Sequence, residues 1–121
     1  MTPSHIHLHK RSNTLELHFN GQDYQLECEL LRVLSPSAEV RGHGNPVLQT
    51  GKKHVSITAI EPVGNYAIKL TFDDGHDSGI YDWSYLYDLC THKDHYWDQY
   101  LAELHAANAS REPGATVVQL S

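Results

Sequence analysis

One pattern occurs twice along this chain and limits the folds open to it. It consists of an alternation of apolar and polar residues, a turn, a second short strand and then apolar residues at helical spacing. The first copy begins at residues 15–19, turns at Asn20-Gly21 and continues into a helical run over residues 30–34. Such alternation is typical of a half-buried strand, and Asn-Gly favours the tight turn of a hairpin. The sequence therefore predicts a hairpin followed by a helix.

The second copy begins at residues 66–72, turns at residues 73–79 and continues from Tyr81 into a second helical run. Asp82 precedes that run, and aspartate is a favoured residue at helix N-termini. An isolated hairpin is only marginally stable in water, so the two units are expected to share one core. The predicted fold class is α+β: an antiparallel sheet built from two hairpin-plus-helix units, with a C-terminal helix and a mobile tail.

The length of 121 residues fits one domain. We expect this domain to cover residues 1–107 and a flexible tail to cover residues 108–121, where periodicity is weak. Cys28 and Cys90 lie inside amphipathic runs and lack the spacing of a metal or redox motif. They are expected to be buried as small hydrophobic residues.

Charge and hydropathy exclude two classes of partner. The formal net charge is -6 with neutral histidines, whereas binding to a phosphate backbone depends on clustered Lys and Arg. Nucleic acid is therefore not expected. The chain also lacks the run of about 18 apolar residues that a membrane span requires, and residues 1–11 lack the apolar segment of a signal peptide. The sequence predicts a cytoplasmic protein and leaves its oligomeric state open.

Ten histidines are an unusually large number for this length. Histidine is a common metal ligand and titrates near neutral pH. His5, His7 and His9 alternate with apolar residues, so they share one face of a predicted strand. They either converge on an ion or form the solvated face of a half-buried strand, and the alternation favours the solvated face.

Two segments concentrate side chains that are able to do chemistry. Residues 35–44 contain two hydroxyls, a carboxylate, a guanidinium and an imidazole: Ser35, Ser37, Glu39, Arg41 and His43. Residues 73–79 contribute Asp74, His76 and Asp77. Buried polar groups need partners, so each cluster is expected to be exposed or mutually satisfied. We expect residues 73–79 to form a hairpin loop that packs near residues 35–44, although a polar turn without a site explains the same residues.

These motifs together resemble a known family. Leu31-Arg32, residues 35–44, residues 64–67 and residues 73–81 are similar to motifs of the gamma-butyrobetaine hydroxylase N-terminal-like family, and the resemblance covers about residues 5–90. Members of that family are small stand-alone bacterial proteins of unknown function, the N-terminal domains of gamma-butyrobetaine and trimethyllysine dioxygenases, and a domain of a chloroplast iron–sulphur scaffold protein. The resemblance implies a compact α+β accessory domain that serves assembly or interaction.

The resemblance also bears on metal binding. In the hydroxylases this domain holds a structural zinc through three cysteines and a histidine. His76 matches the histidine, but the cysteine positions correspond to Ser35, Ser37 and Val40. A serine hydroxyl is a far poorer ligand than a thiolate, so the zinc site of the family is not expected here.

A weaker site for zinc or another divalent metal remains an expectation. It would use His43 and His76, provided that the loop folds back onto the hairpin. The oxygen donors would come from nearby carboxylates, namely Glu39, Asp74 or Asp77.

The leading functional hypothesis is a non-catalytic accessory domain that binds another protein or handles metal. The scaffold-protein resemblance links it to iron–sulphur or metalloprotein maturation. The alternative is a small-ligand-binding protein or an enzyme with a polar Ser/His/Asp site around His43 and His76, where imidazole and carboxylate act as acid and base. An oxygenase is not expected, because the catalytic domain of the hydroxylases is missing and His92-Lys93-Asp94 matches an iron triad only in local spacing.

Overall fold

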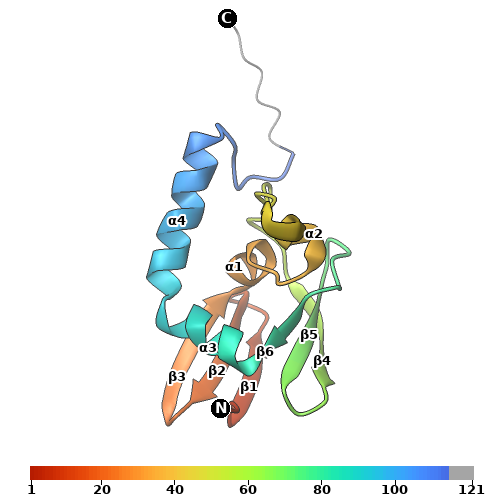
Figure 1. Ribbon diagram of the computed structural model, residues 1–121. Helices are drawn as coiled ribbons and strands as arrows, with labels where there is room; N and C mark the ends of the chain where they lie inside the picture. The colour runs from red at the N-terminus through yellow and green to blue at the C-terminus, as the bar shows by residue number, and fades with distance from the viewer. Residues whose placement is uncertain (115–121) are drawn as a thin grey trace, which may run out of the picture.

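The computed structural model describes residues 1–114, except for the side chain of His43. Within this part the chain forms two three-stranded antiparallel sheets (Figure 1). The strands of the first sheet, in spatial order, are β1 (His5–His9), β2 (Thr14–Phe19) and β3 (Gln22–Glu27). Those of the second sheet are β4 (Ile57–Val63), β5 (Ala67–Phe72) and β6 (Ile80–Asp82). The predicted α+β class is confirmed, with the antiparallel strands divided between two sheets.

Two helices and a 3-10 turn connect the first sheet to the second, and two further helices follow β6. They are α1 (Cys28–Val33), α2 (Ala38–Arg41), the 3-10 turn η1 (Gly42–Gly44), α3 (Trp83–Thr91) and α4 (Lys93–Ala106). Figure 1 shows α4 beside α1, at the end of the molecule opposite the β2–β3 and β4–β5 turns. None of the described helices is long and apolar enough to cross a membrane.

The N-cap of α3 is the residue that the sequence predicts, whereas the N-cap of α4 is a different residue. The Asp82 side chain accepts a hydrogen bond of 2.8 Å from the Tyr85 backbone N–H, so the predicted cap of α3 is confirmed. From its residue type, Asp94 is also predicted to cap the last helix; this prediction is wrong, because His92 is the N-cap of α4. Asp94 lies in the first turn instead, where its charge interacts favourably with the positive end of the helix dipole.

One hydrophobic core joins the two units. Leu15, Leu17 and Phe19 of β2 are fully buried, because alternate residues of a strand face the same side. They belong to the same cluster as the buried residues of β5 and α3. Cys28 and Cys90 are buried and unpaired, as the sequence predicts. The core explains why neither hairpin needs to be stable alone.

Residues 109–114 lie against the body of the domain. The Gly51 N–H donates to the Ser110 carbonyl at 2.9 Å, and the Lys53 N–H donates to the Arg111 carbonyl at 3.0 Å. The Arg111 guanidinium makes two hydrogen bonds of 2.7 Å to Glu29 of α1. These residues belong to the segment expected as a tail from residue 108 onward, and residues 115–121 lie outside the described part of the chain.

Candidate functional site

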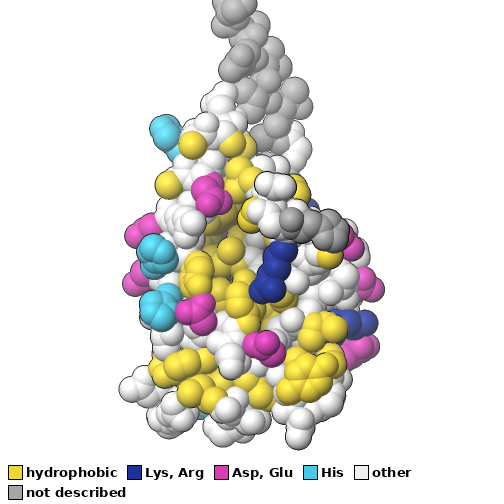
Figure 2. All heavy atoms as spheres, in the orientation of Figure 1, with side chains coloured by type: hydrophobic (Ala, Val, Ile, Leu, Met, Phe, Trp, Pro, Cys, Tyr) yellow, Lys and Arg dark blue, Asp and Glu magenta, His cyan; other side chains and the backbone are white. Residues whose placement is uncertain are grey.

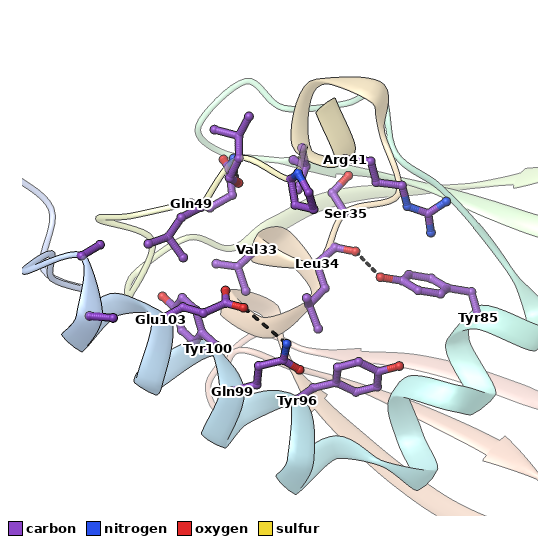
Figure 3. Close-up of a pocket in the computed structure, with 16 residues that line it drawn as sticks. Val33, Leu34, Ser35, Arg41, Gln49, Tyr85, Tyr96, Gln99, Tyr100 and Glu103 are labelled. Atoms are coloured by element: carbon purple, nitrogen blue, oxygen red, sulfur yellow. Dashed lines mark hydrogen bonds between the residues drawn. The ribbon is translucent and has the colours of Figure 1, made fainter. Parts of the chain in front are cut away.

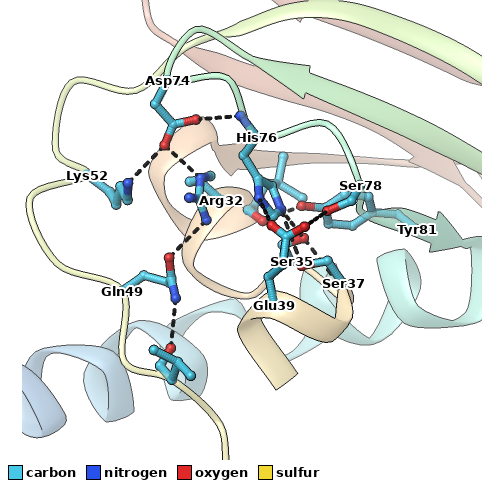
Figure 4. Close-up of polar contacts among 12 residues, drawn as sticks. Arg32, Ser35, Ser37, Glu39, Gln49, Lys52, Asp74, His76, Ser78 and Tyr81 are labelled. Carbon is cyan, nitrogen blue, oxygen red and sulfur yellow. Dashed lines mark hydrogen bonds and ion pairs between the residues drawn. The ribbon is translucent and has the colours of Figure 1, made fainter. Parts of the chain in front are cut away.

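The two polar clusters meet between α1–α2 and the β5–β6 hairpin (Figure 4). The Ser35 hydroxyl lies 2.8 Å from His76 Nε2, and the Ser37 hydroxyl lies 3.4 Å from the same nitrogen. Glu39 lies 3.4 Å from His76 Nδ1 and accepts a hydrogen bond of 3.1 Å from the Ser78 hydroxyl. The two segments therefore pack together, as the sequence predicts.

Local backbone geometry brings these side chains together. The helix α1 ends at Val33, ahead of Ser35-Pro36, because the residue before a proline is disfavoured in the α conformation. On the hairpin, the His76 carbonyl accepts from the Phe72 N–H at 2.9 Å, which closes the turn. A Cβ atom at Gly79 would lie 2.4 Å from the Ser35 hydroxyl, so this close approach requires glycine.

Asp74 links three segments beside this cluster. Its carboxylate accepts hydrogen bonds of 2.8 Å from Arg32 Nε and 2.9 Å from Lys52 Nζ (Figure 4). Burial raises the pKa of Asp74, but the hydrogen bonds from Lys52, the His76 backbone N–H and Arg32 outweigh burial and hold the pKa at about 2. Asp74 therefore connects α1, the loop before β4 and the hairpin as a carboxylate.

Sequence reasoning missed part of this network. Arg32 is buried and also donates to Gln49 at 3.1 Å. The sequence signal for Arg32 was its position inside an apolar helical run, because a charged residue that is buried there requires a partner. Gln49 and Lys52 lie in an irregular loop, where no periodicity marks them.

Two of the predicted site residues, Asp77 and Arg41, lie apart from the Ser35–His76 cluster. Asp77 is exposed and makes no side-chain hydrogen bond or ion pair with the described side chains. Arg41 lies over the ring of Tyr85, with 5.0 Å between the guanidinium carbon and the ring centroid. The side chain of His43 lies outside the described residues, so its distance from His76 stays a prediction.

Ser35, His76 and Glu39 contact one another in the order serine–histidine–carboxylate, as in a catalytic triad, but the serine is not accessible to a substrate. Burial, and then the charge of Arg32, lower the pKa of His76, which favours the neutral imidazole. With Nδ1–H directed at Glu39, Nε2 is assigned as the acceptor from Ser35. However, Ser35 is only 1% exposed, whereas the side chain of Glu39 is 70% exposed. The geometry supports a structural role in which polar groups satisfy one another.

Acidification is expected to destabilise the protein through His76. Its pKa in the folded protein is below the ordinary value of 6.5, so protonation favours the unfolded state. The contribution of neutral His76 is complete above about pH 6.5 and is lost as the pH falls below that value. We expect the free energy of unfolding to fall between about pH 7 and about pH 5, and to fall less in His76→Gln. Chemical denaturation at each pH measures the difference.

The matched control for this prediction is His105→Gln, which replaces an exposed histidine of α4. This control should retain the pH dependence of the wild type. An equal reduction in both variants would contradict the role of His76.

The residues at the family's zinc positions do not fit a closed four-ligand site. Ser35 and Ser37 supply hydroxyls that hydrogen-bond to the imidazole, and Val40 supplies no donor. Among the side chains that the structure describes, no group of three or more His, Cys, Asp or Glu residues is arranged to hold a metal ion. Hydrogen bonds from Ser35 and Ser37 to His76 connect these two segments.

A separate feature is an apolar cleft between α4 and the α1–α2 segment. It encloses about 730 Å³. In Figure 2, hydrophobic side chains gather in the hollow on this face of the molecule. The main walls come from α1, the loop after η1, α3 and α4, through Val33, Leu34, Val47, Tyr85, Tyr96 and Tyr100 (Figure 3). We refer to this hollow as the cleft.

Polar groups lie mainly at the ends of the cleft. Figure 3 shows Arg41 and Tyr85 at one end, and Gln49 and Glu103 toward the other. The hydroxyl of Tyr85 donates to the Leu34 carbonyl, so it is already satisfied. Sequence reasoning did not find the cleft, because its walls come from four segments far apart in the chain.

Comparisons with known proteins identify relatives of this chain. The family model described as gamma-butyrobetaine hydroxylase-like, N-terminal, matches residues 6–87. One NMR solution structure is 58% identical in sequence to this chain, with a TM-score of 0.86, and the match covers 98% of this chain and 96% of the other. A second NMR solution structure is 56% identical, with a TM-score of 0.81, and the match covers 99% of this chain and 92% of the other. A crystal structure of a DUF971-family protein of unknown function from Acidithiobacillus ferrooxidans is 38% identical, with a TM-score of 0.63, over 73% of this chain and 91% of that chain. A search of the curated proteins finds no match.

Proposed function

Because this chain belongs to the gamma-butyrobetaine hydroxylase-like N-terminal family, we propose that it is a non-catalytic accessory domain that binds a small ligand with an apolar body in the cleft. The observation that carries this proposal is the contrast between the two sites. Ser35, Ser37 and His76 of the family motifs are buried and hydrogen-bond to one another, as the 2.8 Å contact between Ser35 and His76 illustrates. The cleft, by contrast, is open and has mainly apolar walls.

The size and lining of the cleft support ligand binding. Small-molecule sites are typically concave, about 300–1,000 Å³ in volume and lined by apolar and aromatic residues with a few polar groups. The cleft encloses about 730 Å³ and includes three tyrosines, Tyr85, Tyr96 and Tyr100. An apolar body placed against these rings would remove hydrophobic surface from water, which favours binding.

Two narrower forms of the accessory role rest on the resemblance. A role in iron–sulphur or metalloprotein maturation is supported by the related domain of the scaffold protein. A metal-handling role requires a ligand set that includes His43 together with His76. If these two histidines bind zinc, the ion should raise the melting temperature of the wild type more than that of a His43→Ala/His76→Ala variant.

Filling the cleft tests the proposed ligand site. The probe is N-phenylnaphthylamine, a neutral molecule whose fluorescence increases in apolar surroundings. We expect the wild type to bind it and Ala107→Trp to lose most of the binding, because Ala107 lines the cleft and an indole would occupy the space. The matched control is Ala102→Trp, which places the same side chain at an exposed position of α4 that does not line the cleft. Circular dichroism and melting temperature establish that both variants fold.

Two results would contradict the proposal. Absence of binding by the folded wild type would show that the cleft does not take an apolar ligand. Self-association of the wild type that disappears in Ala107→Trp would assign the cleft to a second copy of the chain instead.

A further inference from the structure

The end of the cleft near α3 carries a cation without an anionic partner. Arg41 is exposed at the end of α2, and its guanidinium lies over the Tyr85 ring. Within the described part of the chain, the guanidinium forms no ion pair. The contact with the Tyr85 ring orients the guanidinium, and the exposed side of the guanidinium remains accessible to a ligand.

The carboxylates around the cleft have other partners. Glu39 accepts from Ser78 and faces His76. Asp88 accepts from the Tyr96 hydroxyl and lies 2.9 Å from His92. Glu103 accepts from Gln99 at 3.3 Å, toward the opposite end of the cleft (Figure 3). None of them neutralises Arg41.

We infer that the ligand of the cleft is an amphipathic anion, in which a carboxylate, sulfonate or phosphate group binds Arg41 and an apolar body lies against Leu34 and the tyrosines. This inference rests on the proposed function and adds the charge and orientation of the ligand. A guanidinium presents a planar set of N–H donors that matches such oxyanions. The apolar walls favour the apolar body of the ligand, because a charged group placed against them would lose its hydration and gain no polar partner.

The position of Arg41 favours one orientation. Arg41 is the only Lys or Arg among the described residues that line the cleft, so an anionic group is attracted to that end, where Asp88 is already paired with His92 and the Tyr96 hydroxyl. At the opposite end the same group would meet the like charge of Glu103. The anion therefore lies near α3, and the apolar body extends along α4 toward Val33 and Ala107.

A matched pair of probes separates the charge from the apolar body. Anilinonaphthalene sulfonate is N-phenylnaphthylamine with one added sulfonate. We expect the wild type to bind the sulfonate about threefold more tightly than the neutral probe at low salt, because a partly exposed ion pair contributes modestly. High salt should reduce the difference. In Arg41→Gln the ratio of the two affinities should fall to about one, because only the sulfonate loses an ionic partner.

The control is Lys10→Gln, which removes one positive charge from the exposed turn between β1 and β2 and should keep the preference. Binding of the neutral probe without a preference for the sulfonate would overturn the inference and leave the proposed function intact. A preference that persists in Arg41→Gln would likewise overturn it. Failure of both probes to bind would instead refute the proposed function.

Discussion

We expect Arg111→Ala to lower the free energy of unfolding by about 3 kcal/mol, the lower end of the range for breaking a buried ion pair. Glu29 is 4% exposed and accepts two hydrogen bonds of 2.7 Å from Arg111 and one of 2.8 Å from Tyr100. Removal of the guanidinium leaves this carboxylate buried and without its counter-charge. The partial exposure of Arg111 lets water offset part of the loss. Chemical denaturation measures the change.

Two further variants test the cause of this loss. Lys53→Ala breaks the exposed ion pair with Glu112 and should change the stability by less than about 1 kcal/mol. Addition of Glu29→Gln to Arg111→Ala should recover part of the loss, because a neutral amide costs less to bury than a carboxylate. A loss below about 1 kcal/mol in Arg111→Ala would show that residues 109–112 do not secure α1.

The second large effect is a gain of metal binding. We expect Ser35→Cys/Ser37→Cys/Val40→Cys to bind zinc together with His76, because three thiolates and an imidazole form a closed tetrahedral site. Ser35 and Ser37 already direct their hydroxyls at His76 Nε2, and Val40 follows Ser37 by one helical turn. At a thousandfold excess over its Kd, zinc should stabilise this variant by about 4 kcal/mol relative to its metal-free form.

Thermal unfolding with zinc and with a chelator measures this gain, and cobalt absorption reports thiolate ligation. The same triple variant carrying His76→Ala lacks the fourth ligand and should bind zinc more weakly. The wild type should respond far less, since Ser35, Ser37 and Val40 supply no thiolate. An unchanged melting temperature of the triple variant would contradict the proposed correspondence between this cluster and the zinc site of the family.

The parts of the fold that local patterns determine were predictable. Alternation identified β2, and Asp82 identified the start of α3, because both signals depend on neighbouring residues. The meeting of residues 35–44 with the β5–β6 hairpin was predictable from the residue chemistry and the family motifs. Ser35 and His76 lie 41 positions apart in sequence, so the polar character of both segments and the family motifs, and not any local pattern, indicated that they meet.

The remaining features depend on long-range packing that no single segment encodes. Arg111 lies in a segment with weak periodicity, so no local pattern indicated that its side chain would contact Glu29, which is 82 positions earlier in the sequence. The cleft likewise arises only when α4 lies beside α1. The start of α4 was misplaced because Asp94 is a favourable cap by type, whereas the short connection after α3 places His92 at that position.

Backbone amide shifts recorded during titration of the wild type with N-phenylnaphthylamine locate the bound probe on the protein. We propose that the cleft binds ligand while the Ser35–His76 cluster is structural. This proposal predicts that the largest shift changes occur at residues 33–34, 47–49 and 106–107, with small changes at residues 73–79. Changes concentrated at residues 73–79, or no changes at saturating probe, would contradict it.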